Sequence, residues 1–185
     1  YCDKFQTYVN RIRPGTFESL NKKYEHPRLI IPFYDVDNQV FAIQGRAFGK
    51  EQPKYLTIKL QENKQKIFGL ERINLHKRLY IVEGPLDSLF LDNCLAAGGA
   101  DLQLPVDKKD VVFIFDNEPR NKEIIDRMYK MIEKDYMIVI WPEGQKEKDI
   151  NDMILNGKSK SDIRSSPGRS PDTLYMYIHI VKLTR

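Results

Sequence analysis

The sequence has few of the residues that build cysteine and histidine metal sites, and it has no long apolar run. Its only two cysteines are Cys2 and Cys94, and its three histidines, His26, His76 and His179, are far apart. Without a Cys-x-x-Cys pair, neither a structural zinc site nor a disulfide framework is supported. No apolar run approaches roughly 18 residues, so we expect no transmembrane helix and no membrane partner.

The composition is that of an ordinary folded protein with a mild excess of positive charge. Of 185 residues, 41% are hydrophobic and 30% are charged, and the net charge is +4. The first residues lack the apolar core of a signal peptide, and two scattered thiols fit a reducing, intracellular compartment. The length allows one domain with a substantial core or two small lobes.

The most informative stretch is Leu79–Asp87. Leu79–Val82 is a short apolar run, rich in β-branched and aromatic residues, and it predicts a buried strand. Glu83 follows at the expected strand end, and a Gly-Pro pair then favours the start of a helix. A carboxylate in this position lies at the edge of an α/β sheet where ligands usually bind. Asp87 comes one helical turn later on the same side.

Residues 71–155 alternate apolar, strand-like runs with helical segments. The predicted strands are residues 79–82, 94–98, 111–115 and 137–141. Two helices are expected, one with an apolar face of Leu86, Leu89, Phe90 and Leu91, and one over Glu123–Lys134 with a stripe of Ile124, Ile125, Met128 and Ile132. This series predicts a mainly parallel sheet covered on both faces.

The first third of the chain has a different pattern. Residues 1–27 form a polar lead-in with a short helix around Asp3–Ile12 and a second helix that could begin at Thr16. A β-hairpin is predicted from strands 29–34 and 40–48, with the turn at residues 35–39. At the other end, residues 157–171 are typical of a linker, and residues 174–183 are apolar and β-prone.

Basic residues are mixed with aromatic residues between positions 46 and 68. They are Arg46, Lys50, Lys54, Lys59, Lys64 and Lys66, with Phe48, Tyr55 and Phe68 among or beside them. Such a mixture suits a phosphate-lined groove or the binding of a single strand. A solvated, lysine-rich loop beside core aromatics has the same pattern.

Acidic residues follow three of the predicted strands. Glu83 follows the first, Asp116 and Glu118 follow the third, and Asp149 follows the last after a charged loop. Parallel strands place their carboxyl ends at one edge, so these carboxylates should converge and raise one another's pKa unless a cation lies among them. Such ligands suit Mg²⁺ or Mn²⁺. Each acid alone has a simpler explanation: a solvated strand end, a helix cap at Asp149, or a first-turn acid at Asp87.

These residues resemble the Toprim domain of DnaG-type DNA primases. Glu83–Asp87 resembles the EGxxD box, Asp116–Glu118 stands where the family has DxD, and Lys148–Asp152 resembles a KDxND-like third box. Upstream segments resemble the RNA-polymerase core of these primases in the same order: residues 28–33, 45–46, 53–56 and 67–70. The resemblance covers roughly residues 28–156 and is greatest to primase subunits of T4-like bacteriophages.

The resemblance implies roles for individual residues. Glu83, Asp116 and Glu118 would be catalytic and would hold Mg²⁺ or Mn²⁺, with Asp87 and Asp149 as further metal-binding residues. In an alternative that the resemblance also implies, Glu83 would act as general base or acid instead. Arg46, Lys54 and Lys66 would bind template or nucleotide phosphates. The second box is DxE rather than DxD, and the zinc-binding domain that usually precedes this core is not in the sequence.

The fold implied by the resemblance is an α/β Toprim domain, a mainly parallel sheet flanked by helices, with a small basic α+β N-terminal lobe. The expected divisions are a lead-in at 1–27, the lobe at 28–76, the Toprim domain at 77–156, and a linker with an atypical tail at 157–185.

The activity implied is that of a DNA primase, a DNA-directed RNA polymerase that makes short RNA primers. It would use a single-stranded DNA template and ribonucleoside triphosphates, with a replicative helicase as partner, in the cytoplasm (the host cytoplasm if the chain is phage-encoded). Two alternatives remain open: another Toprim enzyme, such as a nuclease or topoisomerase fragment, and a non-catalytic module that binds single-stranded DNA.

Overall fold

The computed structural model describes residues 1–18, 25–98 and 105–164. It divides into two compact units, Tyr1–Lys66 and Ile67–Arg185. The sequence suggested a division after residue 76, but residues 67–76 contribute to the second unit. Ile67 is 3% exposed in its core, and Phe68 exchanges two backbone hydrogen bonds with Ala96, at 2.9 and 3.0 Å.

The first unit contains a three-stranded antiparallel sheet in the order β1–β2–β3. Its strands are β1 (Arg28–Tyr34), β2 (Val40–Ala47) and β3 (Tyr55–Lys59). The predicted hairpin is confirmed, with Ile31 opposite Gln44 and a bulge between Phe33 and Tyr34. Asp35 closes the turn by accepting hydrogen bonds from the backbone N–H groups of Asp37 and Gln39. The third strand was not predicted, because its five residues are bounded by polar segments with no clear alternation.

The lead-in residues are part of this unit. The helix expected near the start is confirmed as α1 (Phe5–Ile12), and its Phe5 and Val9 pack with Ile43 and Ile58 of the sheet. Gly45 makes this approach possible, because a Cβ added there would lie 2.5 Å from the Phe5 ring. The second helix suggested from Thr16 does not form at residues 16–18, and the rest of that segment lies outside the described residues.

The second unit contains a four-stranded, all-parallel sheet in the order β5–β4–β6–β7. The strands are β4 (Leu79–Val82), β5 (Cys94–Ala96), β6 (Val111–Phe113) and β7 (Met137–Ile138). The expected parallel α/β architecture is therefore confirmed. The last three strands are shorter than predicted, although the residues after β6, Ile114 and Phe115, remain buried.

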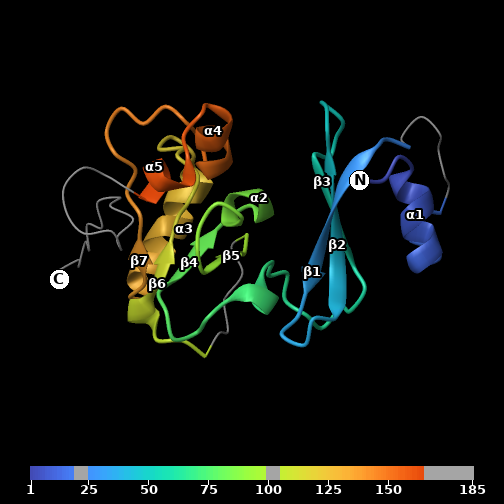
Figure 1. Ribbon diagram of the computed structural model, residues 1–185, viewed down its shortest axis with the longest axis horizontal. Helices are drawn as coiled ribbons and strands as arrows, with labels where there is room; N and C mark the ends of the chain where they lie inside the picture. The colour runs from blue at the N-terminus through green and yellow to red at the C-terminus, as the bar shows by residue number, and fades with distance from the viewer. Residues whose placement is uncertain (19–24, 99–104, 165–185) are drawn as a thin grey trace. The chain divides into compact units, whose positions relative to one another are not determined.

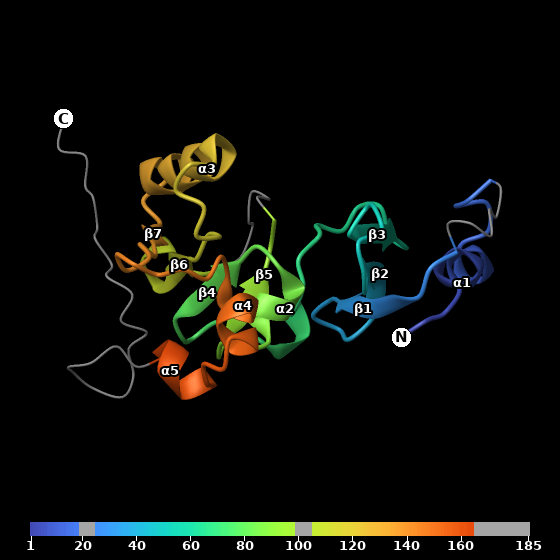
Figure 2. The same ribbon diagram turned by 90° about the horizontal axis from the view of Figure 1, so that it is seen from above.

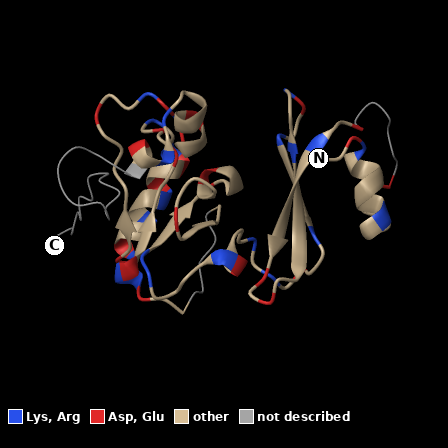
Figure 3. Cartoon of the chain, in the orientation of Figure 1, with Lys and Arg blue, Asp and Glu red and all other residues tan. Residues whose placement is uncertain are grey.

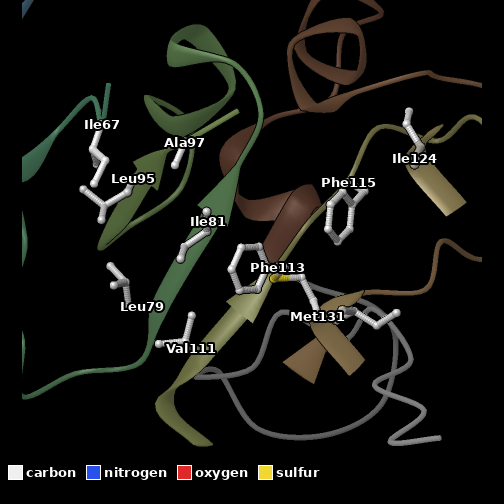
Figure 4. Packing of buried hydrophobic residues seen from close by; sticks show 11 residues of the cluster. Ile67, Leu79, Ile81, Leu95, Ala97, Val111, Phe113, Phe115, Ile124 and Met131 are labelled. Carbon is white, nitrogen blue, oxygen red and sulfur yellow. The ribbon is translucent and has the colours of Figure 1, made fainter. Parts of the chain in front are cut away.

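Helices cover both faces of this sheet, as Figure 1 and Figure 2 show. On one face lies α3 (Lys122–Glu133); on the other lie α2 (Pro85–Ser88), α4 (Ile150–Leu155) and α5 (Lys160–Arg164). Two single-turn 3₁₀ helices, η2 (Leu70–Arg72) and η3 (Lys108–Asp110), precede β4 and β6. The core beneath α3 is formed by residues of all four strands of this sheet and the helix, including Ile81, Leu95, Phe113 and Met131 (Figure 4).

Three details differ from the sequence predictions. The helix after Glu83 ends at Ser88, so Leu89 is 44% exposed instead of lying on a buried helical face. On α3 the buried residues are Ile124 and Met131, and the latter was not in the predicted stripe. A helix, α5, occupies part of the expected linker because Ile163 is buried there, while residues 165–185 lie outside the described part of the chain. None of the described helices is both long and apolar enough to cross a bilayer.

Candidate functional site

The corner between β4 and α2 brings Glu83 and Asp87 to the edge of the sheet where the carboxyl ends of the strands lie. Gly84 makes this corner tight, because a Cβ added to it would lie 2.5 Å from Oδ2 of Asp87. Arg72 links the short helix α2 to β5. Its guanidinium donates to the Ser88 hydroxyl at 2.6 Å and to the Cys94 carbonyl at 3.2 Å. The two acids are thus positioned by packed elements rather than by a free loop.

Glu83 pairs with an arginine from α3. Arg127 donates to Glu83 Oε1 at 2.5 Å, and the side chains are 24% and 23% exposed. The guanidinium also lies over the Phe115 ring, 5.7 Å from its centroid. Arg127 follows Ile124 by three residues and precedes Met131 by four, so it lies on the buried side of α3. A charge on an apolar helical stripe is a signal that the sequence analysis missed.

The second acidic box lies at the end of β6 and is occupied by a lysine. Lys148 Nζ is 3.4 Å from Asp116 Oδ2 and 2.5 Å from Glu118 Oε1. Glu118 also accepts a hydrogen bond of 2.6 Å from the Asn121 side chain. Basic and acidic residues therefore lie side by side at this edge (Figure 3). Lys148 was recognised as part of the third box, but no role followed from its position in sequence.

Asp149 and Asp87 are tied to the start of α4. Asp149 accepts a hydrogen bond from the Asp152 N–H at 2.7 Å, which confirms the alternative that it caps this helix. Asp87 accepts one from the Asn151 N–H at 2.8 Å, across 64 residues of sequence. Glu83, Asp87, Asp116 and Asp149 line one small pocket, together with apolar and aromatic side chains. Glu118 is not among its lining residues.

The pKa values of the carboxylates reflect this crowding. Burial raises the pKa of Glu83, and the Asp116 carboxylate adds to the effect. Burial also raises the pKa of Asp116, with Asp149 and Glu118 contributing. The pKa of Asp87 rises to about 6, chiefly through burial and further through Asp149 and Asp116. Only Glu118 has the opposite shift within this group: the hydrogen bond from Lys148 lowers its pKa.

The raised pKa of Asp87 predicts a specific pH dependence of stability. Its folded pKa of about 6 lies above the ordinary 3.8, so the folded chain holds a proton that the unfolded chain releases over this range. The stabilisation is complete below the ordinary value and is lost as pH rises to about 6, an effect of roughly 2 to 3 kcal/mol. Asp87→Asn, which keeps an oxygen acceptor for Asn151, should therefore gain that much relative to wild type between pH 4 and pH 7.

Urea denaturation without divalent ions, at pH values across this interval, measures the difference. Asp126→Asn is the control, because that carboxylate is exposed on α3. Stability curves of wild type and Asp87→Asn that stay parallel across the interval would contradict the assignment of the raised pKa to Asp87.

The side chains at this edge of the sheet are of the chemical type that binds a hard divalent cation. The donors are carboxylate oxygens, which Mg²⁺ and Mn²⁺ prefer, and repulsion from neighbouring carboxylates adds to the burial that raises the pKa values of Glu83, Asp87 and Asp116. In the described part of the chain, no three acidic, histidine or cysteine side chains are close enough together to hold an ion. The carboxylates pair instead with Arg127 and Lys148.

The basic residues expected to bind phosphate lie on the first unit. Arg46 donates to the Tyr55 hydroxyl at 3.2 Å, and the Lys54 ammonium lies 5.7 Å from the centroid of the same ring. Lys66 lies apart from them and lines a broad pocket with Arg13, Lys59 and Glu62. Partial burial lowers the pKa of Lys66. Two of the three predicted residues are therefore brought together around an aromatic ring.

Arg28 supports this basic surface from inside the unit. It is 3% exposed, and its guanidinium donates to the carbonyls of Gly45 and Pro53, at 3.1 and 3.0 Å. It thereby holds the segment before β3, which carries Lys54, against β2. The sequence analysis included Arg28 in a segment that resembles the primase core, but it did not predict this supporting role.

Known proteins with similar sequences and folds are DNA primases. The DNA primase of Enterobacteria phage T4 is 41% identical over 158 residues, which are 83% of this chain and 45% of the phage protein. This chain thus spans less than half the length of that relative. No protein-family model matches the chain.

Solved structures agree in fold. The Aquifex aeolicus primase, with its zinc-binding and RNA polymerase domains, matches with a TM-score of 0.57 and 16% identity, over 89% of this chain and 49% of that one. A DnaG primase catalytic domain bound to single-stranded DNA matches with a TM-score of 0.52 and 18% identity, over 72% of this chain and 49% of that one. The chain is therefore related in sequence to a phage DNA primase and has the α/β fold of DnaG-type primase catalytic cores.

Proposed function

We propose that this chain is the catalytic core of a DNA primase, a metal-dependent enzyme that joins ribonucleotides into short primers on single-stranded DNA. One observation supports this proposal more strongly than any other. Glu83, Asp87, Asp116 and Asp149 line one pocket at the carboxyl edge of a parallel sheet, in a chain 41% identical to a phage primase.

In this proposal Glu83, Asp116 and Glu118 hold Mg²⁺ or Mn²⁺, with Asp87 and Asp149 beside them. A bound ion would lower the pKa of the attacking 3′-hydroxyl and neutralise charge on the leaving pyrophosphate. In an alternative role, Glu83, whose pKa is raised by burial, would accept the hydroxyl proton instead of holding the ion. Arg127 keeps Glu83 oriented at the edge of the sheet.

The basic surface of the first unit would bind phosphates. Arg46 and Lys54 flank the exposed ring of Tyr55, and a cation next to an aromatic face suits the backbone and bases of a single strand. Lys66, which lines a broad pocket with Arg13 and Lys59, would bind template or nucleotide phosphate. A related catalytic domain was solved with single-stranded DNA bound, which supports this assignment.

The cellular setting follows from the same relationship. Primers are needed where a duplex has just been opened, so we expect a replicative helicase as partner. Because the relative is a phage protein, we expect the reaction to take place in the cytoplasm of the host.

A primer-synthesis assay tests the proposal directly. Single-stranded DNA, labelled ribonucleotides and Mg²⁺ or Mn²⁺ are incubated with wild type and with Asp116→Ala, with and without helicase. Short RNA made by wild type alone supports the proposal. Degraded template without RNA would indicate a nuclease, and tight DNA binding by both proteins without any product would indicate a binding module.

Replacing Lys54 by Ala should weaken binding of single-stranded DNA in a salt-dependent way. Each lost phosphate contact is expected to reduce the slope of log affinity against log salt by about 0.7. Fluorescence anisotropy over a range of salt concentrations measures the slope, and Lys77→Ala, an exposed lysine of the second unit, is the control. An unchanged slope would favour the solvated-loop interpretation of these lysines.

A further inference from the structure

The ammonium of Lys148 lies beside Asp116 and Glu118, where the proposed metal ion would bind. Its ammonium contacts Asp116 Oδ2 at 3.4 Å and Glu118 Oε1 at 2.5 Å, and no other lysine or arginine is paired with either carboxylate among the ion pairs of the described residues. Both carboxylates are metal-binding residues in the proposed function. The lysine therefore neutralises the charge that a divalent ion would neutralise.

The loop that carries Lys148 is fastened to the acidic box itself. Asn117, the residue between Asp116 and Glu118, donates its backbone N–H to the Lys148 carbonyl at 2.6 Å. Its side-chain amide donates to the carbonyls of Gln145 and Glu147, at 2.9 and 3.1 Å. One asparagine thus makes three hydrogen bonds across about thirty residues of sequence. The position of Lys148 is set by this clamp and not by a chance surface contact.

The pKa shifts of the neighbouring groups agree with this position of Lys148. The Lys148 hydrogen bond lowers the pKa of Glu118, and the two carboxylates together raise the pKa of Lys148. Lys148 also offsets part of the upward pKa shift of Asp116 and Glu83. The Lys148 side chain is 50% exposed, so its ammonium can leave the box by rotating into solvent without unfolding the loop.

We propose that Lys148 is a built-in competitor for the divalent ion: its ammonium pairs with Asp116 and Glu118 in the metal-free protein, and an ion held by these carboxylates displaces it. This inference rests on the proposed function, since it takes the acidic edge to be the metal site. It assigns to Lys148 a positioning role, because it acts through the two carboxylates. The competition lowers the affinity of the free protein for metal.

Binding of Mn²⁺ to the free protein tests this without any enzymatic assay. Electron paramagnetic resonance of unbound Mn²⁺ gives the affinity of wild type and of Lys148→Gln, which removes the charge but keeps a polar side chain. Removing one paired, partly exposed charge should tighten Mn²⁺ binding about tenfold. Lys148→Arg, which keeps the charge, should stay within about twofold of wild type.

Lys146→Gln is the matched control, because it makes the same change in net charge from an exposed position in the same loop. It should leave the Mn²⁺ affinity within about twofold of wild type, and circular dichroism establishes that each variant is folded. Equal affinities of Lys148→Gln and wild type, with binding still lost in Asp116→Asn, would overturn the competition while the metal site stands. Absence of Mn²⁺ binding in wild type and Lys148→Gln alike would overturn both this inference and the proposed function.

Discussion

Replacing Glu83 by Gln is expected to lower the rate of primer synthesis at least about a thousandfold, a loss of about 4 kcal/mol of transition-state stabilisation. Glutamine has nearly the same shape and can still accept the hydrogen bond from Arg127. It lacks the negative charge, so it binds a divalent ion poorly and cannot accept a proton. The loss should therefore appear in activity and not in the fold.

The measurement is the rate of ribonucleotide incorporation at saturating template, next to the thermal unfolding midpoint of each protein. Glu123→Gln provides the control, because it removes an exposed carboxylate from the first turn of α3, outside the pocket. Full activity of Glu83→Gln would remove Glu83 from the proposed machinery. A lowered unfolding midpoint would instead assign the loss to a structural role.

Replacing Phe5 by Ala is expected to reduce the stability of the first unit by about 3 to 5 kcal/mol. The Phe5 ring is 1% exposed, and it lies against Gly45 and beneath the Arg28 guanidinium, 5.7 Å from its centroid. Truncation leaves a cavity that α1 cannot fill, since Gly45 offers no side chain. The remaining contacts of the helix with the sheet, through Val9, should not compensate for the loss.

Hydrogen exchange on the full chain separates this effect from general unfolding. Amides of β1, β2 and β3 should exchange faster in Phe5→Ala, whereas those of β4 and β6 should keep their protection. Ile12→Ala is the control, because Ile12 belongs to the same helix and is 41% exposed. Equal exchange in Phe5→Ala and wild type would mean that the packing of α1 does not stabilise the sheet of the first unit.

Local patterns accounted for much of the fold. The alternation of apolar runs and helical segments predicted β4, the β1–β2 hairpin and α3, because each of these patterns lies within one short, continuous segment of the sequence. Strand ends predicted where Glu83 and Asp116 would lie, since parallel strands share one carboxyl edge. Predictions of strand length were less accurate. The strand β7 has two residues, although Val139 after it is buried and donates its N–H to the Phe113 carbonyl at 2.8 Å.

The sequence by itself determined the chemistry of this protein. It showed which carboxylates follow the strands and which lysines and arginines lie in the first unit, and it showed that these two sets of residues resemble a primase core. Only the tertiary structure decided how these groups are paired. Arg127 reaches Glu83 across 44 residues, and Asn117 reaches the loop before Lys148 across 28 and 30. Such pairs are set by the packing of distant elements, and periodicity and turn chemistry, which are local, carry no information about them.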